Sequence, residues 1–130
     1  MTRIPPRLRV ADNLLAFETG DAIRGRAVVR VCDKLRRHLT KILGATGFLT
    51  LLRRALTLAK AQTLALSAVE VKPDGTLDHA DDLDRSGEIV LVSQLLDLLV
   101  TFVGVAVTVR ILQDAWPNAT IESLDLERQP

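Results

Sequence analysis

The sequence has few of the residues on which disulfide-rich domains and many enzymes depend. Its 130 residues include no tyrosine, one cysteine, one methionine and two histidines. The single cysteine, Cys32, excludes an internal disulfide, and the opening residues MTRIPPRLR contain no apolar stretch of the kind found in secretory signals. We therefore expect a cytoplasmic protein.

Aromatic side chains are also scarce, although 48% of the residues are hydrophobic. The aromatic residues are Phe17, Phe48, Phe102 and Trp116. A core made mainly of Leu, Val, Ile and Ala is typical of packed helices. The length fits one domain, which buries roughly two thirds of its unfolded surface. We predict an extended N-terminal arm over residues 1–7, a single helical domain over 8–116 and a flexible acidic tail over 117–130.

The sequence contains no C-x-x-C, H-E-x-x-H, G-x-S-x-G or Walker motif. His38 lies in a basic segment and His79 in an acidic one, and both are interpreted as solvated side chains. The acidic residues around His79 do not have the spacing of a calcium-binding loop. Cys32 falls on an apolar stripe and is interpreted as a core residue rather than a nucleophile. We therefore expect no catalytic residue, no cofactor and no metal site.

The net charge of +1 conceals two halves of opposite sign. Residues 1–60 contain 13 basic and 4 acidic residues, whereas residues 61–130 contain 4 basic and 12 acidic residues. The first interpretation is that the halves attract each other, within one chain or between subunits. The alternative is non-specific binding of nucleic acid or another external anion by the basic helix at residues 21–43. Its candidate residues are Arg24, Arg30, Arg37 and Lys41. Nucleic acid is the weaker alternative, because no aromatic platform accompanies these charges.

Apolar periodicity predicts three helices in the first half of the chain. The clearest covers residues 21–43, where apolar residues recur at spacings of four and three. These residues are Val28, Cys32, Leu35, Leu39 and Ile42. Gly44 supplies a natural stop, and after a turn at 44–47 a second helix follows that is apolar on most sides. A short helix is also expected over residues 8–17.

The segment at residues 67–79 changes to a period of two. Val69 and Val71 alternate with charged residues, and Pro73-Asp74-Gly75 is a turn sequence. A small β-hairpin is therefore expected, and it must rest on the helices because two strands are marginal alone. The acidic residues that follow, together with Ser86, are candidate N-caps for the next helix.

The most apolar part of the chain lies between Ser86 and Ala115. Polar and small residues recur there at helical spacing, so we predict a helix, and the alternation of valines at 103–109 makes a buried strand the alternative. The run at residues 89–112 is also long enough to cross a bilayer, which leaves a single-pass or peripheral membrane protein with a basic cytoplasmic half as an alternative.

A straight helix of this length would extend about 45 Å and overhang its neighbours. The predicted fold is mainly α: a bundle of three to four helices, with a small β-hairpin inserted between the third helix and the last, long one. Its excess apolar surface indicates a non-enzymatic protein that acts by self-association or as an adaptor or subunit of a bacterial assembly. The partner is then a second copy or another protein. The candidate interface residues are Leu95, Leu99, Phe102, Ala106 and Val109.

Several segments resemble a set of small uncharacterised bacterial helical proteins. The resemblance is carried by ATGF, LLRRALTLA, a V-x-V-x-x-D-G hairpin, LLVTFVG, Arg110 and the sequence DAWP, and it covers about Gly44 to Pro117. The resemblance implies a bacterial, mostly helical, soluble protein, and it assigns no activity and no site residue. Those proteins tend to have an acidic residue after the glycine of LLVTFVG, where this chain has Val105.

Overall fold

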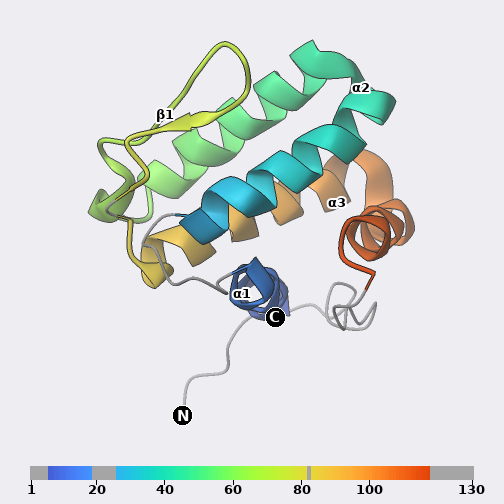
Figure 1. Ribbon diagram of the computed structural model, residues 1–130, viewed down its shortest axis with the longest axis horizontal. Coiled ribbons are helices and arrows are strands. Elements are labelled where there is room, and N and C mark those ends of the chain that lie inside the picture. The colour runs from blue at the N-terminus through green and yellow to red at the C-terminus, as the bar shows by residue number, and fades with distance from the viewer. Residues whose placement is uncertain (1–5, 19–25, 82, 118–130) are drawn as a thin grey trace.

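The computed structural model describes residues 6–18, 26–81 and 83–117 (Figure 1). These residues are mainly helical, as the composition predicts, and they form three α-helices and a small antiparallel sheet of two strands. The elements are α1 (Pro6–Glu18), α2 (Arg26–Lys60), the 3₁₀ turn η1 (Leu64–Leu66), β1 (Glu70–Val71), β2 (Leu77–Asp78) and α3 (Arg85–Ala115).

Helix α1 begins earlier than the sequence suggests. Pro6 is its first residue, so the expectation of an extended arm as far as residue 7 is wrong at its last two positions. Proline is well tolerated there because the amide of a first helical residue has no partner within the helix. One face of α1 is buried, through Val10, Ala11, Leu14 and Leu15. Residues 1–5 and 118–130, to which the rest of the predicted arm and almost all of the predicted tail belong, lie outside the described residues.

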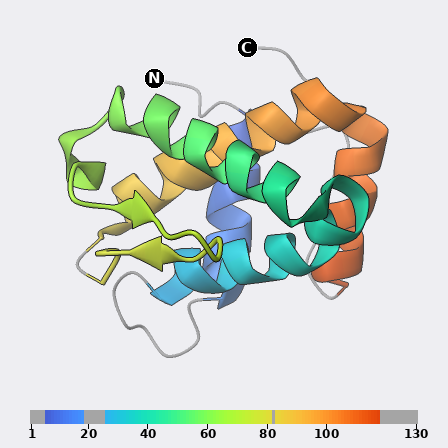
Figure 2. The same ribbon diagram turned by 90° about the horizontal axis from the view of Figure 1, so that it is seen from above.

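Helix α2 consists of two arms that meet at Gly44, where φ is 79° and ψ is 165°. This confirms the predicted stop, but the helix resumes at the next residue instead of after a turn over 44–47. The arms run back along each other (Figures 1 and 2). In the first arm the predicted apolar stripe is buried as far as Leu39, whereas Ile42, beside the break, is 53% exposed. Residues 21–25 of the predicted helix lie outside the described part of the chain.

The predicted hairpin is confirmed between α2 and α3. Glu70 pairs with Asp78 and Val71 with Leu77 in antiparallel register. The turn is held by a hydrogen bond from the amide of Gly75 to the carbonyl of Lys72. Gly75 has φ +85°, and a Cβ there would lie 3.3 Å from Arg36 Cδ and 3.4 Å from Phe48. Because Arg36 and Phe48 belong to different arms of α2, the hairpin tip packs across both.

Helix α3 begins after Asp84, whose side chain accepts a hydrogen bond of 3.0 Å from the amide of Gly87. The predicted acidic N-cap is therefore confirmed, and so is the choice of a helix over a strand for the valine-rich segment. The expectation of one straight helix is wrong, because Gly104 has φ 86° and ψ 165°. Only glycine adopts such a positive φ readily, so the chain turns there and forms two arms.

A single, mainly aliphatic core joins all three helices. Its largest fully buried side chains are Trp116, Phe48 and leucines from every helix. The first arm of α3 contributes the fully buried Leu91, Leu95 and Leu99, and α3 packs against both α2 and α1. The long apolar helix is therefore covered, over much of its length, by its own chain.

Candidate functional site

The two glycine breaks lie at the same end of the molecule. Both views place the turn of α2 and the turn of α3 at one side (Figures 1 and 2). Leu43 and Val103, which directly precede the two glycines, line one pocket. No atom lies within 4 Å of a Cβ built on either Gly44 or Gly104. The positive φ of the backbone, and not crowding around a side chain, therefore favours glycine at both positions. We call this region the kink end.

Large apolar side chains are exposed at the kink end. Phe102 is 67% exposed, Ile42 53% and Val107 41%, and each lies within three residues of a break glycine. The other large exposed apolar residues of the described chain, Phe17 and Leu64, lie elsewhere. Single exposed apolar residues are ordinary, whereas these three lie close to the two breaks.

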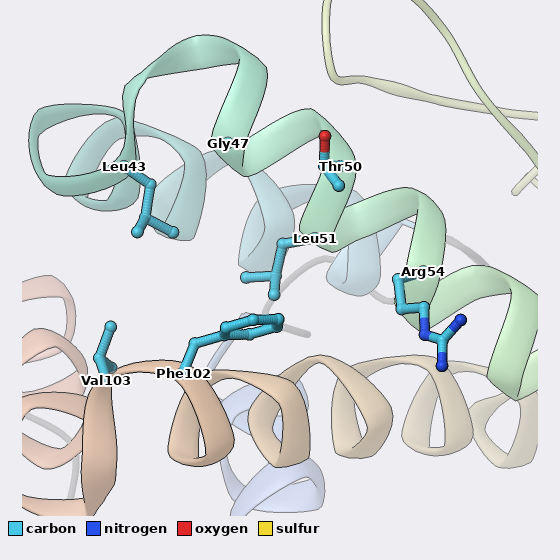
Figure 3. Close-up of a pocket in the computed structure, with 7 residues that line it drawn as sticks. All are labelled: Leu43, Gly47, Thr50, Leu51, Arg54, Phe102 and Val103. Carbon is cyan, nitrogen blue, oxygen red and sulfur yellow. The ribbon is translucent and has the colours of Figure 1, made fainter.

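A pocket of about 460 Å³ opens at the kink end between the second arm of α2 and α3 (Figure 3). Its apolar walls are formed by Leu43, Leu51, Phe102 and Val103. Gly47, Thr50 and Arg54, all from the second arm of α2, complete the lining. The pocket is therefore bordered mostly by carbon, with a guanidinium at one side.

The predicted interface residues do not form one exposed face. Leu95 and Leu99 are completely buried in the core of the chain, and Val109 is only 8% exposed. Phe102 and Ala106 are exposed. The division does not follow the break at Gly104, because Phe102 is exposed on the first arm and Val109 is buried on the second. Of the five, Phe102 and Ala106 are the residues available to a partner.

The predicted anion-binding residues are likewise divided. Arg24 lies outside the described residues. Arg30 donates a hydrogen bond of 3.2 Å to the backbone carbonyl of Glu18. Arg37 and Lys41 are exposed on the first arm of α2. The structure therefore directs part of the basic helix toward the C-terminal end of α1.

A polar cluster around Glu18 escaped the sequence analysis. The buried carboxylate of Glu18 accepts a hydrogen bond of 2.8 Å from Trp116 Nε1 and forms an ion pair with Lys34. The Lys34 ammonium also lies 5.5 Å from the ring centroids of Phe17 and Trp116, within the range of a cation–π interaction. The cluster therefore joins the ends of α1 and α3 to the first arm of α2.

A second polar group joins the starts of α2 and α3. The buried Glu88 carboxylate accepts a hydrogen bond of 3.0 Å from the amide of Val28, and Arg85 lies 3.8 Å from it. Arg85 also pairs with Asp12 of α1 at 3.3 Å. Burial raises the pKa of Glu88, opposed by the Val28 amide and by Arg85. Glu88 thus acts as a cap for α2 that is supplied by another helix.

The cysteine and the two histidines, which the sequence analysis considered for chemistry, differ in their surroundings. Cys32 is buried, and burial together with the neighbouring Asp33 raises the pKa of its thiol to about 12. A thiol of this kind is not a nucleophile at neutral pH. His38 lies 2.9 Å through Nδ1 from the carbonyl oxygen of Lys34, and His79 lies 3.5 Å from Asp78. No group of three His, Cys, Asp or Glu side chains that could hold a metal occurs within residues 6–18, 26–81 and 83–117.

Two helical segments are long and apolar enough to cross a membrane, by length and composition. They are Ala27–Lys60 and Arg85–Ala115, and a third of the most apolar stretch of each is buried within the molecule. Both segments contain a glycine break.

Comparisons with models of protein families, with curated proteins and with solved structures find no match for this chain.

Proposed function

We propose that this chain is a non-enzymatic helical protein that acts by self-association, and that the kink end is its contact surface. In this proposal α1, the arms of α2 and the first arm of α3 form a bundle of three to four helices. The observation that supports it most is the exposure of Ile42, Phe102 and Val107 beside the two breaks. Because α3 turns at Gly104, this exposed surface is smaller than that of a straight, overhanging helix.

The surface has the composition of an interface centre. Aromatic and aliphatic side chains dominate such centres, and charged groups lie at their edges. Phe102 supplies the aromatic group, and the exposed Arg54 lies beside the pocket that Phe102 lines. A symmetric dimer would place this surface against its own copy, so that each Phe102 contacts the partner.

Size-exclusion chromatography with light scattering at micromolar concentration tests the proposal. The wild-type chain has a mass of 14.3 kDa, and we expect a dimer or larger species without detergent. Replacement of Phe102 and Val107 by Ser should shift the protein to the monomer. Leu64→Ser is the matched control, since Leu64 is 88% exposed but lies outside the kink end. A wild-type protein that remains a monomer contradicts the proposal.

Membrane attachment is the second candidate, and the two segments of membrane-spanning length support it. From Arg85 to Val103 the first arm of α3 extends about 28 Å, close to the thickness of a bilayer core. In this case the protein should stay with the membrane fraction after an alkaline wash. Recovery in the supernatant excludes it.

A further inference from the structure

We propose that the pocket at the kink end binds the anion of a single-chain fatty acid, with the alkyl chain between α2 and α3 and the carboxylate at Arg54. This goes beyond the proposed self-association, because the ligand is a small molecule and its binding is measured per chain. The pocket volume of about 460 Å³ falls within the roughly 300–1,000 Å³ that is usual for small-molecule sites.

The walls of the pocket select a hydrocarbon. Leu43, Leu51, Phe102 and Val103 line it from both helices, and their side chains offer no nitrogen or oxygen (Figure 3). A polar group placed among them would lose its hydrogen bonds to water without replacement, which is unfavourable. An alkyl chain loses nothing there and gains the free energy of leaving water.

Arg54 gives the pocket a charged side. In Figure 3 its side chain extends from the second arm of α2 toward α3, at the side of the pocket away from Leu43 and Val103. Arg54 is exposed, and it has no ion pair with any residue in the part of the chain that the structure describes. A guanidinium presents two parallel donors that match a carboxylate. Thr50, one turn earlier on the same arm, also lines the pocket, and its hydroxyl points away from Phe102 (Figure 3).

The lining of the pocket is therefore asymmetric, with hydrocarbon along the walls and, at one side, the Arg54 guanidinium, which forms no ion pair among the described residues. A fatty-acid anion has the same asymmetry, with one charge at the end of an apolar chain. Neither a fully apolar molecule nor a polyanion would use both features. The exposed Phe102 ring borders the opening, where it can cover the part of the alkyl chain that the walls leave open.

Isothermal titration calorimetry of the full chain with sodium dodecanoate, below its micelle concentration, tests the proposal. We expect saturable binding of one dodecanoate per chain. In the series octanoate, decanoate and dodecanoate, the affinity should rise about fourfold for each methylene that the pocket encloses.

Variants at Arg54 test the charged side. Arg54→Gln should weaken dodecanoate binding about threefold to tenfold, because a charge-assisted hydrogen bond is lost. Arg53→Gln is the matched control, since Arg53 is an exposed neighbour that does not line the pocket, and it should bind as the wild type does. Arg54→Glu should reverse the preference, so that dodecylammonium binds more tightly than dodecanoate.

Val103→Phe, which fills the pocket from α3, should abolish binding while circular dichroism confirms its helix content. If this variant does not fold, the reversal by Arg54→Glu decides alone. The proposal is overturned by any of three results: no saturable binding to the wild type, equal effects of Arg54→Gln and Arg53→Gln, or a folded Val103→Phe protein with unchanged affinity. If the protein is a dimer that does not bind dodecanoate, the fatty-acid proposal is wrong and self-association is supported. If it is a monomer that binds dodecanoate, self-association is wrong and the fatty-acid proposal is supported.

Discussion

The two ends of the first arm of α3 differ in how the chain covers them. At its start, Asp84 caps the helix, Glu88 caps α2 and Arg85 reaches Asp12 of α1. At its other end, Gly104 turns the chain, Phe102 is exposed and a pocket stays open. The polar groups at the start hold three helices together. At the kink end, by contrast, large apolar side chains stay exposed to water.

The largest loss of stability is expected when a buried residue between these two ends is replaced. Leu99→Ala removes a completely buried side chain and leaves a cavity, so it should lower the free energy of unfolding by about 2–5 kcal/mol. Urea denaturation followed by circular dichroism measures this value. A loss no larger than that of an exposed residue would show that Leu99 lies outside the core.

Glu88→Ala is expected to have the next largest effect. It leaves the buried amide of Val28 without an acceptor, which should cost about 1–3 kcal/mol of unfolding free energy. Glu88→Gln retains an acceptor oxygen and should cost less at acid pH. Equal losses for the two variants would contradict the role of Glu88 as a cap.

The wild-type protein and Glu88→Gln should also differ in how their stability depends on pH. Burial raises the pKa of Glu88, so the folded protein keeps the proton of the Glu88 carboxyl group at pH values where the unfolded chain has released it. Stability contributed by this group is therefore lost as the pH rises from the ordinary glutamate pKa through the raised folded pKa. Glu88→Gln should gain stability relative to the wild type over that interval. A constant difference between pH 4 and pH 7 would contradict the prediction, and thermal unfolding at each pH gives the comparison.

A change at the kink end itself should have a moderate cost. Gly104→Ala places a side chain at φ 86°, and this should lower the unfolding free energy by about 1–2 kcal/mol although the space around the Cβ is open. Gly104→Asn should cost less, because asparagine tolerates positive φ better. If alanine stabilised the protein, α3 would be straight at this residue in solution.

The smallest effect is expected at the exposed surface. Phe102→Ala should change the unfolding free energy of the single chain by no more than about 0.5 kcal/mol, because the ring is mostly in water. It should nevertheless weaken association, which light scattering reports. Together with Leu99→Ala, three residues earlier, it separates the core face of α3 from the exposed face that is proposed for contact.

Local signals predicted much of this fold. The periodicity of residues 28–39 gave one buried stripe, the Pro73-Asp74-Gly75 sequence gave the hairpin, and Asp84 was among the expected caps. Each depends on residues a few positions apart. Gly44 is an expected stop because a glycine directly after the apolar stripe of residues 28–42 is a typical end of a helix.

The remaining features depend on residues distant in sequence. Gly104 lies inside a run that is apolar on both sides, so no change of pattern marks the break. Glu18 and Trp116 are separated by 98 residues, and Val28 and Glu88 by 60, so only the packed fold brings them together. The periodicity identifies the helix that holds the five candidate interface residues, but it does not show that Leu95, Leu99 and Val109 are buried and that Phe102 and Ala106 are exposed.

Trp116 has one more consequence for experiments. It is the single tryptophan in a chain without tyrosine, and its indole lies where α1, the first arm of α2 and the end of α3 meet. Ultraviolet emission excited at long wavelength therefore comes from one known position. The protein carries its own fluorescent reporter of that junction, and the kink end can be altered or titrated while this signal is followed without any attached dye.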